Sequence, residues 1–351
     1  MTRTADVQIE EPVTAPAQTS FTARWLPGTR PRVIAMLVLA VLLVAPWIAD
    51  IYTISIMSRI LVMALLTVSV SFLTGVSGLP TLGQAAFFGI GGYTAALLSL
   101  AGYGIGPVQV LAGLTLGALV ALATGSVVVR SRGVTFLMLT FAVGELFHSA
   151  AAVSRDLTGG TDGLPGIPPV VPLPGMAALT NDGLVFYYVL AVFLPLFLLT
   201  EIVVRSPFGL ALRSIRDNEA RMRATGYPVN RYLLAGYGMA GGLAGAAGAL
   251  WVSVLRYVSP SDLGFSMAAF ALLAAVIGGL GSMWGACAGA ALVILVRDYI
   301  GGEHISVAGR TVTGPLLLGV LFIVVVYLLP RGIAGIRTQL ASRTPGKAAD
   351  S

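Results

Sequence analysis

The sequence predicts an all-α integral membrane protein, a polytopic helical bundle of about ten transmembrane helices with a short helix on its cytoplasmic side. Hydrophobic residues make up 56% of the 351 residues and charged residues only 10%, and the mean hydropathy is +0.89. A water-soluble globule of this length would need more polar surface. The apolar stretches also run almost from end to end, which favours a single membrane domain.

Crossing a bilayer takes about 20 apolar residues of helix. Candidate spans lie at 33–49, 54–74, 84–101, 108–129, 133–153, 184–204, 231–255, 266–281, 285–300 and 314–330. The eighth and ninth are short and close together, so they form either two crossings or one broken, re-entrant unit. The sequence therefore predicts a membrane domain over 33–330, flanked by tails at 1–32 and 331–351.

The basic residues orient these spans. Most of the 21 Lys and Arg residues fall on one side of the membrane if the N-terminus is cytoplasmic. The exceptions are Arg59, Arg155, Arg256, Arg297 and Arg310. Positive-inside insertion produces this bias. We expect a disordered cytoplasmic tail at 1–32, a cytoplasmic tail at 331–351, the loop 154–183 outside and the loop 205–230 inside.

The sequence lacks the residues that several classes of enzyme and metal-binding protein require. Cys287 is the one cysteine, and Lys347, in the tail, is the one lysine. A phosphate-binding loop of the G-x-x-x-x-G-K-[ST] type therefore has no place here, and neither hydrolase nor metal-site motifs occur. We expect no enzymatic activity, no metal and no cofactor bound by this chain. The formal charge of +6 lies mainly beside the spans, which favours a lipid bilayer over nucleic acid as its partner.

The inner loop 205–230 contains a predicted amphipathic helix. Ser206 can cap its start, and Gly226 can end it. Acid-then-base pairs occur four residues apart: Asp217/Arg221 and Glu219/Arg223. Such a helix could lie among lipid headgroups or dock a partner protein. The mixed charge favours docking, because a lipid-seeking helix gains nothing from its acidic residues.

Polar residues within the spans are candidates for a translocation path, because polar groups in lipid are costly. Glu145 lies three residues before His148 on one helix face, and either bonds to an arginine of another helix or forms a polar site on the path. Gln84, near a helix start, can line a path or bond a neighbouring helix. Other ionisable groups lie nearer helix ends, where they can snorkel: Arg59, Glu201, Arg297 and Asp298.

Two further patterns have structural and functional interpretations. Glycine pairs four residues apart predict close helix packing in lipid: Gly113/Gly117, Gly238/Gly242, Gly241/Gly245 and Gly285/Gly289. The outer loop is rich in glycine and proline and contains Asp156 and Asp162. It is either a structured connector or a surface that receives an extracytoplasmic partner.

Six motifs in order resemble the membrane permease subunits of ABC importers for branched-chain amino acids, over roughly residues 55–340. The motifs are LGQAAFFGIGGYTAALL (82–98), LTFAVGELF (139–147), LTGGTDGLPGIP (157–168), SPFGLALRSIRDNEARMRATGYPVNRY (206–232), IGGLGSMWGACAGA (277–290) and LPRGIAG (329–335). The chain is similar to the longer of the two permease partners in such importers.

The resemblance implies an inner-membrane complex with a second permease subunit, two ATP-binding subunits that use ATP and Mg²⁺, and a periplasmic solute-binding protein. It implies that the cytoplasmic loop couples to the ATPase through five residues: Arg213, Arg216, Asn218, Glu219 and Gly226. The loop departs from the general importer pattern E-A-A-x-x-x-G, because Glu219 and Ala220 precede Arg221 and the glycine comes one residue late. Permeases for urea, amides and aromatic acids share much of the pattern, and a proton- or ion-coupled secondary transporter using Glu145 is the alternative of another class.

Overall fold

The computed structural model describes residues 40–47, 49–301, 306–307, 310–311 and 319. The chain divides into two compact units, Met1–Val44 and Ala45–Ser351, and the elements named below belong to the second. The predicted tails 1–32 and 331–351 lie outside the described residues, as does the predicted span 314–330 apart from residue 319. The predicted first span is described only from residue 40, and residues 40–47 are helical.

Eight long helices account for most of the described part. They are α2 (Ile51–Ser71), α3 (Gln84–Leu100), α4 (Gly106–Val128), α5 (Gly133–Val153), α7 (Asp182–Arg205), α10 (Val229–Leu255), α11 (Phe265–Gly278) and α12 (Met283–Gly301). Each coincides with a predicted helical segment, with both ends within one turn of the expected residues. The eighth and ninth predicted segments are two separate helices, joined by a tight turn after Gly278.

Shorter elements connect these helices. They are the π-turn η2 (Phe72–Val76), α6 (Arg155–Thr158), η3 (Gly160–Asp162), α8 (Pro207–Asp217), α9 (Glu219–Ala224), η4 (Pro260–Leu263) and the antiparallel strands β1 (Ser306–Val307) and β2 (Arg310–Thr311). The two-residue strands form a small hairpin that the all-α prediction did not include. The predicted outer loop holds α6 and η3, and the predicted inner loop holds α8 and α9.

Five helices in the described ranges are long and apolar enough to cross a membrane: α2 with η2, α4, α5, α7 and α10. The helices α3 and α11 are apolar but shorter. With 17 and 14 residues, they rise about 26 and 21 Å at 1.5 Å per residue, less than the roughly 30 Å of a hydrocarbon core. The fold is that of a helical, multi-pass membrane protein.

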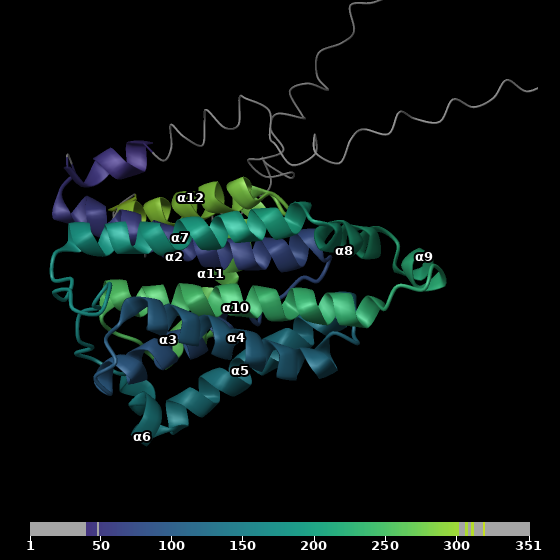
Figure 1. Cartoon of the computed structure of the whole chain (residues 1–351), viewed down its shortest axis with the longest axis horizontal. Helices are drawn as coiled ribbons and strands as arrows, with labels where there is room; N and C mark the ends of the chain where they lie inside the picture. The colour runs from purple at the N-terminus through teal and green to yellow at the C-terminus, as the bar shows by residue number, and fades with distance from the viewer. Residues whose placement is uncertain (1–39, 48, 302–305, 308–309, 312–318, 320–351) are drawn as a thin grey trace, which may run out of the picture. The chain divides into compact units, whose positions relative to one another are not determined.

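Burial separates inner helices from outer ones. In α2 and in α10, 78% of the most apolar 18-residue window is buried, against 28% in α4 and 22% in α5. The helix α10 lies between α2 and α7 on one side and α3 and α4 on the other (Figure 1). Since the exposed sides of α4 and α5 are strongly apolar, lipid or another membrane chain must cover them.

Glycine makes the contact between α4 and α10 possible. A methyl group at Gly245 of α10 would overlap the backbone of Gly113 in α4, and one at Gly91 of α3 would overlap the backbone of Gly245. Backbones this close leave no room for any side chain, so dispersion acts over the whole contact. The packing role predicted for Gly113 and Gly245 is confirmed.

The connecting elements gather at opposite ends of the bundle. The helices α8 and α9 lie where α7 ends and α10 begins, and α6 lies at the other end (Figure 1). At the α6 end, the outer loop is tied to the bundle by backbone hydrogen bonds from Leu164 N–H to Val258 O (2.9 Å) and from Gly106 N–H to Val171 O (2.8 Å). The outer loop is therefore held against the bundle by its own backbone.

Candidate functional site

The helix α8 begins at the residue that the sequence predicts, and its apolar side is buried. The Ser206 Oγ accepts a hydrogen bond from the backbone N–H of Gly209 at 3.4 Å, and Pro207 occupies the first helical position, where a missing N–H costs nothing. Leu212 and Ile215 are buried, at 0% and 3% exposure. The apolar side of α8 thus packs on the bundle and leaves its polar side exposed.

The predicted single helix of the inner loop is broken at Asn218. This residue is extended, with φ −157° and ψ 92°, and its Oδ1 accepts from the backbone N–H of Arg221 at 2.9 Å. Asparagine caps helices well because its side chain competes for backbone donors. The break turns α9 relative to α8, so the predicted pair Asp217/Arg221 is wrong. Asp217 instead pairs with its neighbour Arg216 at 2.9 Å.

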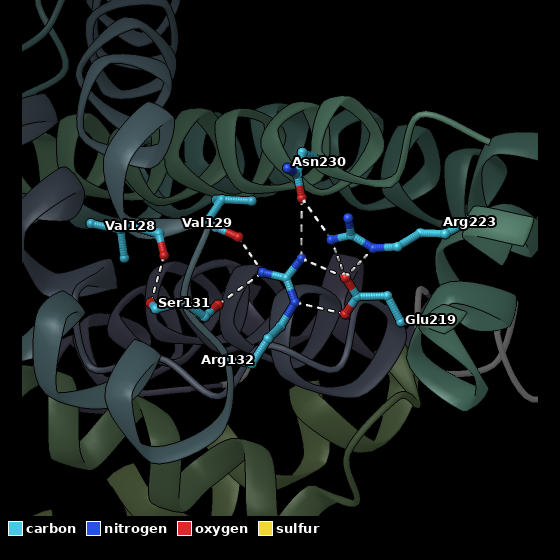
Figure 2. A network of polar contacts seen from close by, with 7 residues as sticks. All are labelled: Val128, Val129, Ser131, Arg132, Glu219, Arg223 and Asn230. Carbon is cyan, nitrogen blue, oxygen red and sulfur yellow. Dashed lines mark hydrogen bonds and ion pairs between the residues drawn. The ribbon is translucent and has the colours of Figure 1, made fainter. Parts of the chain in front are cut away.

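Glu219 forms the centre of a charged network (Figure 2). Its carboxylate accepts from Arg132 Nε at 2.8 Å and Nη2 at 3.0 Å, and from Arg223 Nη2 at 2.6 Å. The Asn230 Oδ1 accepts from the same two guanidinium groups at 3.3 and 3.4 Å. The predicted pair Glu219/Arg223 is confirmed, and Arg132 adds a bidentate ion pair that the sequence did not predict.

This network joins three elements at the end of the bundle that carries α8 and α9. Arg132 lies in the short α4–α5 connection, where its guanidinium also donates to the carbonyls of Val129 and Ser131. Glu219 starts α9, and Asn230 lies in the first turn of α10. The pKa of Glu219 is lowered from 4.5 to about 2: the hydrogen bonds from Arg132 are the largest cause, partial burial opposes them, and the hydrogen bonds from Arg223 lower the pKa further. The carboxylate is therefore ionised at every physiological pH.

Arg216 connects α8 to the membrane bundle. Its Nη1 donates to the carbonyl oxygen of Gly75, in the π-turn that ends α2, and its stem lies against Gly78. Gly75 in turn meets the backbone of Gly281, since a methyl group at Gly75 would overlap it. The Gly281 N–H donates to Ser71 Oγ at 3.2 Å. One arginine thus contacts the turn that holds the α11–α12 junction, and π-turns often mark functional positions.

Two predicted coupling residues remain: Gly226 lies in the turn after α9, and Arg213 lies on α8. Gly226 follows α9 with φ +83°, a conformation that favours glycine, and the next N–H, of Tyr227, bonds the Met222 carbonyl at 3.1 Å. Arg213 is half-buried on α8 and makes no hydrogen bond or ion pair with another described residue. Its guanidinium is available to a partner.

Gln84 begins α3 and is 1% exposed. Neither its Nε2 nor its Oε1 has a hydrogen-bond partner among the described residues. The preceding turn is fixed to α5, because Leu82 N–H donates to Thr140 Oγ1 at 3.3 Å. A buried amide with both ends unpaired is costly, and the bond to a neighbouring helix considered from sequence does not form within the described part of the chain.

Glu145 lies near the middle of α5 with its side chain 40% exposed. Its Oε2 is 3.5 Å from His148 Nδ1 on the same helix face, as the three-residue spacing predicted. No described arginine pairs with Glu145, so the arginine bond considered from sequence does not form within the described part. His148 itself lies against Gly264, the residue before α11. This contact joins α5 to the start of α11.

The two acidic residues of the outer loop are both exposed. Asp156 lies in α6 and Asp162 in η3. Their side chains make no ion pair with other described residues, although the backbone carbonyl of Asp162 accepts from Tyr257 OH at 2.9 Å. The backbone is thus held in place while both carboxylates remain available on the surface.

Two residues of this site escaped the sequence analysis. Arg132 lies 87 residues before its partner Glu219, and Asn230 lies 98 residues after its partner Arg132. A basic residue in a short connection between spans signals orientation, but nothing in the sequence indicates which acid it meets.

Comparisons with known proteins agree with one another. The family model described as branched-chain amino acid transport system / permease component matches residues 52–326. The high-affinity branched-chain amino acid transport system permease protein LivM of Escherichia coli is 28% identical over 86% of this chain and 73% of its own length. LivM of Salmonella typhimurium is 28% identical over 85% and 73%. A probable branched-chain amino acid transport permease protein LivH of Methanocaldococcus jannaschii is 25% identical over 80% and 90%. No solved structure matches the chain.

Proposed function

We propose, because the chain belongs to the family of permease components of branched-chain amino acid transport systems, that it is one membrane subunit of an ATP-driven importer for leucine, isoleucine and valine. In this proposal it pairs with a second permease subunit, two ATP-binding subunits and a periplasmic solute-binding protein. ATP and Mg²⁺ act in the ATP-binding subunits, and this chain carries no catalytic group. The observation that supports it most is the family match over residues 52–326.

The proposed topology is a bacterial inner-membrane protein with about ten crossings and both tails in the cytoplasm. The distribution of arginine supports this orientation, since α8, α9 and the α4–α5 connection are basic and share one end of the bundle. The outer loop with Asp156 and Asp162 then faces the periplasm, where a solute-binding protein docks.

We assign the ATPase-facing surface to the exposed sides of α8 and α9. Arg213 lacks a partner among the described residues. Gly226 forms an exposed turn in a left-handed conformation at the end of α9. Glu219 and Asn218 support this surface from behind: the first fixes α9 to the bundle, and the second fixes its angle to α8. The Glu219 carboxylate acts as a positioning group and leaves the partner contact to the arginines.

Movement passes from this surface to the pore through Arg216. The arginine holds the π-turn at Gly75, and that turn packs on Gly281 at the α11–α12 junction. A displacement of α8 that moves Arg216 therefore acts on α2 and on the junction together, because the backbones of Gly75 and Gly281 are in direct contact. This is the route by which closure of the ATPase dimer would alternate access to the pore.

The test is uptake of labelled leucine into vesicles that contain the chain with or without its partner permease, ATP-binding subunits, binding protein and ATP. The proposal expects uptake only with the full set. Uptake by this chain alone under a proton gradient, abolished by Glu145→Gln, would identify a secondary transporter. ATP-dependent uptake of urea, an amide or an aromatic acid in place of leucine would keep the importer and change its substrate.

A matched pair of variants tests the coupling route within the same complex. Arg216→Gln should leave ATP hydrolysis in place and lower uptake, since the link to Gly75 is lost. Arg213→Gln should instead weaken binding of the ATP-binding subunits, measured by co-purification. Equal loss of hydrolysis and uptake in both variants would contradict the division of roles.

A further inference from the structure

A cavity of about 220 Å³ lies between α2, α10, α11 and α12, and three charged side chains line it: Arg59, Arg297 and Asp298. Its volume is below the roughly 300–1,000 Å³ of pockets for drug-sized ligands and well above the roughly 30 Å³ that one water molecule occupies in the liquid. The space suits a single small solute.

The three charges do not neutralise one another. None of them forms an ion pair with any residue in the described ranges, and Arg59 Nε and Asp298 Oδ2 are buried without a hydrogen-bond partner. The guanidinium of Arg297 lies 5.2 Å from the centre of the Phe270 ring. Charges in a membrane helix are costly and are usually paired or functional. Arg297 is exposed near the end of α12 and can snorkel as expected from sequence, whereas the buried Arg59 Nε and Asp298 Oδ2 face the cavity.

Apart from the indole N–H of Trp251, the rest of the wall is apolar. Met63, Phe270 and Ile294 contribute to it together with Trp251. Two cations, one anion and a hydrocarbon wall within a single small space match a molecule with a carboxylate, an ammonium group and an aliphatic chain. A free branched-chain amino acid combines these three features, whereas urea and simple amides lack the charges.

The cavity also lies on the side from which a transported solute would arrive. Leu255 is the last residue of α10, and Arg297 lies about one turn before the end of α12. Arg59 is eight residues after the start of α2, or about 12 Å along it at 1.5 Å per residue. All three positions belong to the end of the bundle opposite α8 and α9, which is the periplasmic end in the proposed topology.

We propose that this cavity binds the transported amino acid inside the permease, with Arg59 and Arg297 on the carboxylate, Asp298 on the ammonium group and the apolar wall on the side chain. The assignment rests on the proposed function and adds to it a site that recognises the solute after the binding protein releases it. The headgroup of phosphatidylethanolamine, which has a phosphate and an ammonium group, presents related chemistry from the lipid, so the test includes it.

The experiment uses the complete importer complex in vesicles, with Cys287→Ser as background. Ile294→Cys places a thiol on the cavity wall, and Leu295→Cys places the control thiol on a side chain that is 52% exposed. We expect leucine to slow thiol labelling at position 294 and leave position 295 unchanged. The analogues 4-methylpentanoate and 3-methylbutylamine, which lack the ammonium and the carboxylate, should protect far less.

Charge variants complete the test. Asp298→Asn should raise the leucine concentration needed for protection by about 10- to 100-fold, the range for losing a hydrogen bond to a charged group, and Asp298→Glu should restore most of it. If Ile294→Cys does not assemble, Val293→Cys on the same wall replaces it.

The outcomes separate the two proposals. Equal protection by 4-methylpentanoate, or protection by phosphatidylethanolamine without leucine, would overturn the amino-acid site. Absence of protection in a complex that still takes up leucine would overturn the site and keep the importer function. A complete complex that takes up no leucine would overturn the proposed function itself.

Discussion

Replacing Glu219 by glutamine should loosen α9 from the bundle by an amount that the structure allows us to work out. The change removes a bidentate ion pair with Arg132 and the pair with Arg223. It also leaves two guanidinium groups facing each other. Because the Glu219 and Arg132 side chains are 28% and 32% exposed, water screens the pair. We therefore take the upper end of the range for surface pairs, about 1 kcal/mol, rather than the value for a buried pair.

A loss of about 1 kcal/mol corresponds to a roughly fivefold rise in the open population. Amide hydrogen exchange of the peptide that covers α9, measured on the purified permease without ATP-binding subunits, should therefore quicken about fivefold in Glu219→Gln. The matched control is Asp217→Asn, which removes only the pair between adjacent residues with Asp217 66% exposed. That variant should change exchange by less than about twofold.

A double-mutant cycle with Arg132→Gln isolates the pair. The cycle should give a coupling energy of about 1 kcal/mol between positions 132 and 219. Equal exchange in Glu219→Gln and Asp217→Asn, or a coupling energy near zero, would refute the view that this network holds α9 in place.

Three further predictions follow from the same structure. The folded pKa of Glu219, about 2, lies below its ordinary value of 4.5, so the network's stabilisation is fully present above about pH 4.5 and is lost as pH falls through about 2. Exchange in α9, corrected for intrinsic rate, should stay level from pH 7 to 4.5, and loosening at pH 5–6 would contradict the assignment. Gly245→Ala should destabilise the purified permease by about 1–3 kcal/mol through overlap with the neighbouring helix backbone, seen as a lower thermal midpoint. Gly144→Ala, whose new methyl would have ordinary contacts, should leave the midpoint unchanged or raise it. Gly75→Ala should lower ATP-driven uptake more than ATP hydrolysis, because the added methyl overlaps the backbone of Gly281; equal loss of both activities would point to general misfolding.

The sequence alone determined where the helices lie and which residue types fill them. Long apolar runs predict spans because a backbone in lipid must satisfy its own hydrogen bonds, and this constraint acts locally. The bounds of α5, for example, match the prediction residue for residue at Gly133–Val153. Ser206 and Gly226 likewise indicate a start and an end, since capping depends on neighbouring residues only.

Only the tertiary structure decided which side chains meet. The partner of Glu219 lies 87 residues away in Arg132, and the one-residue break at Asn218 changed which acid and base could pair. Arg59 on α2 and the pair Arg297 and Asp298 on α12 look like separate helix-end charges in the sequence, yet they line one cavity. Hydropathy gives the length of each helix but contains no information on its neighbours, because rotation and packing depend on contacts between residues far apart in the chain.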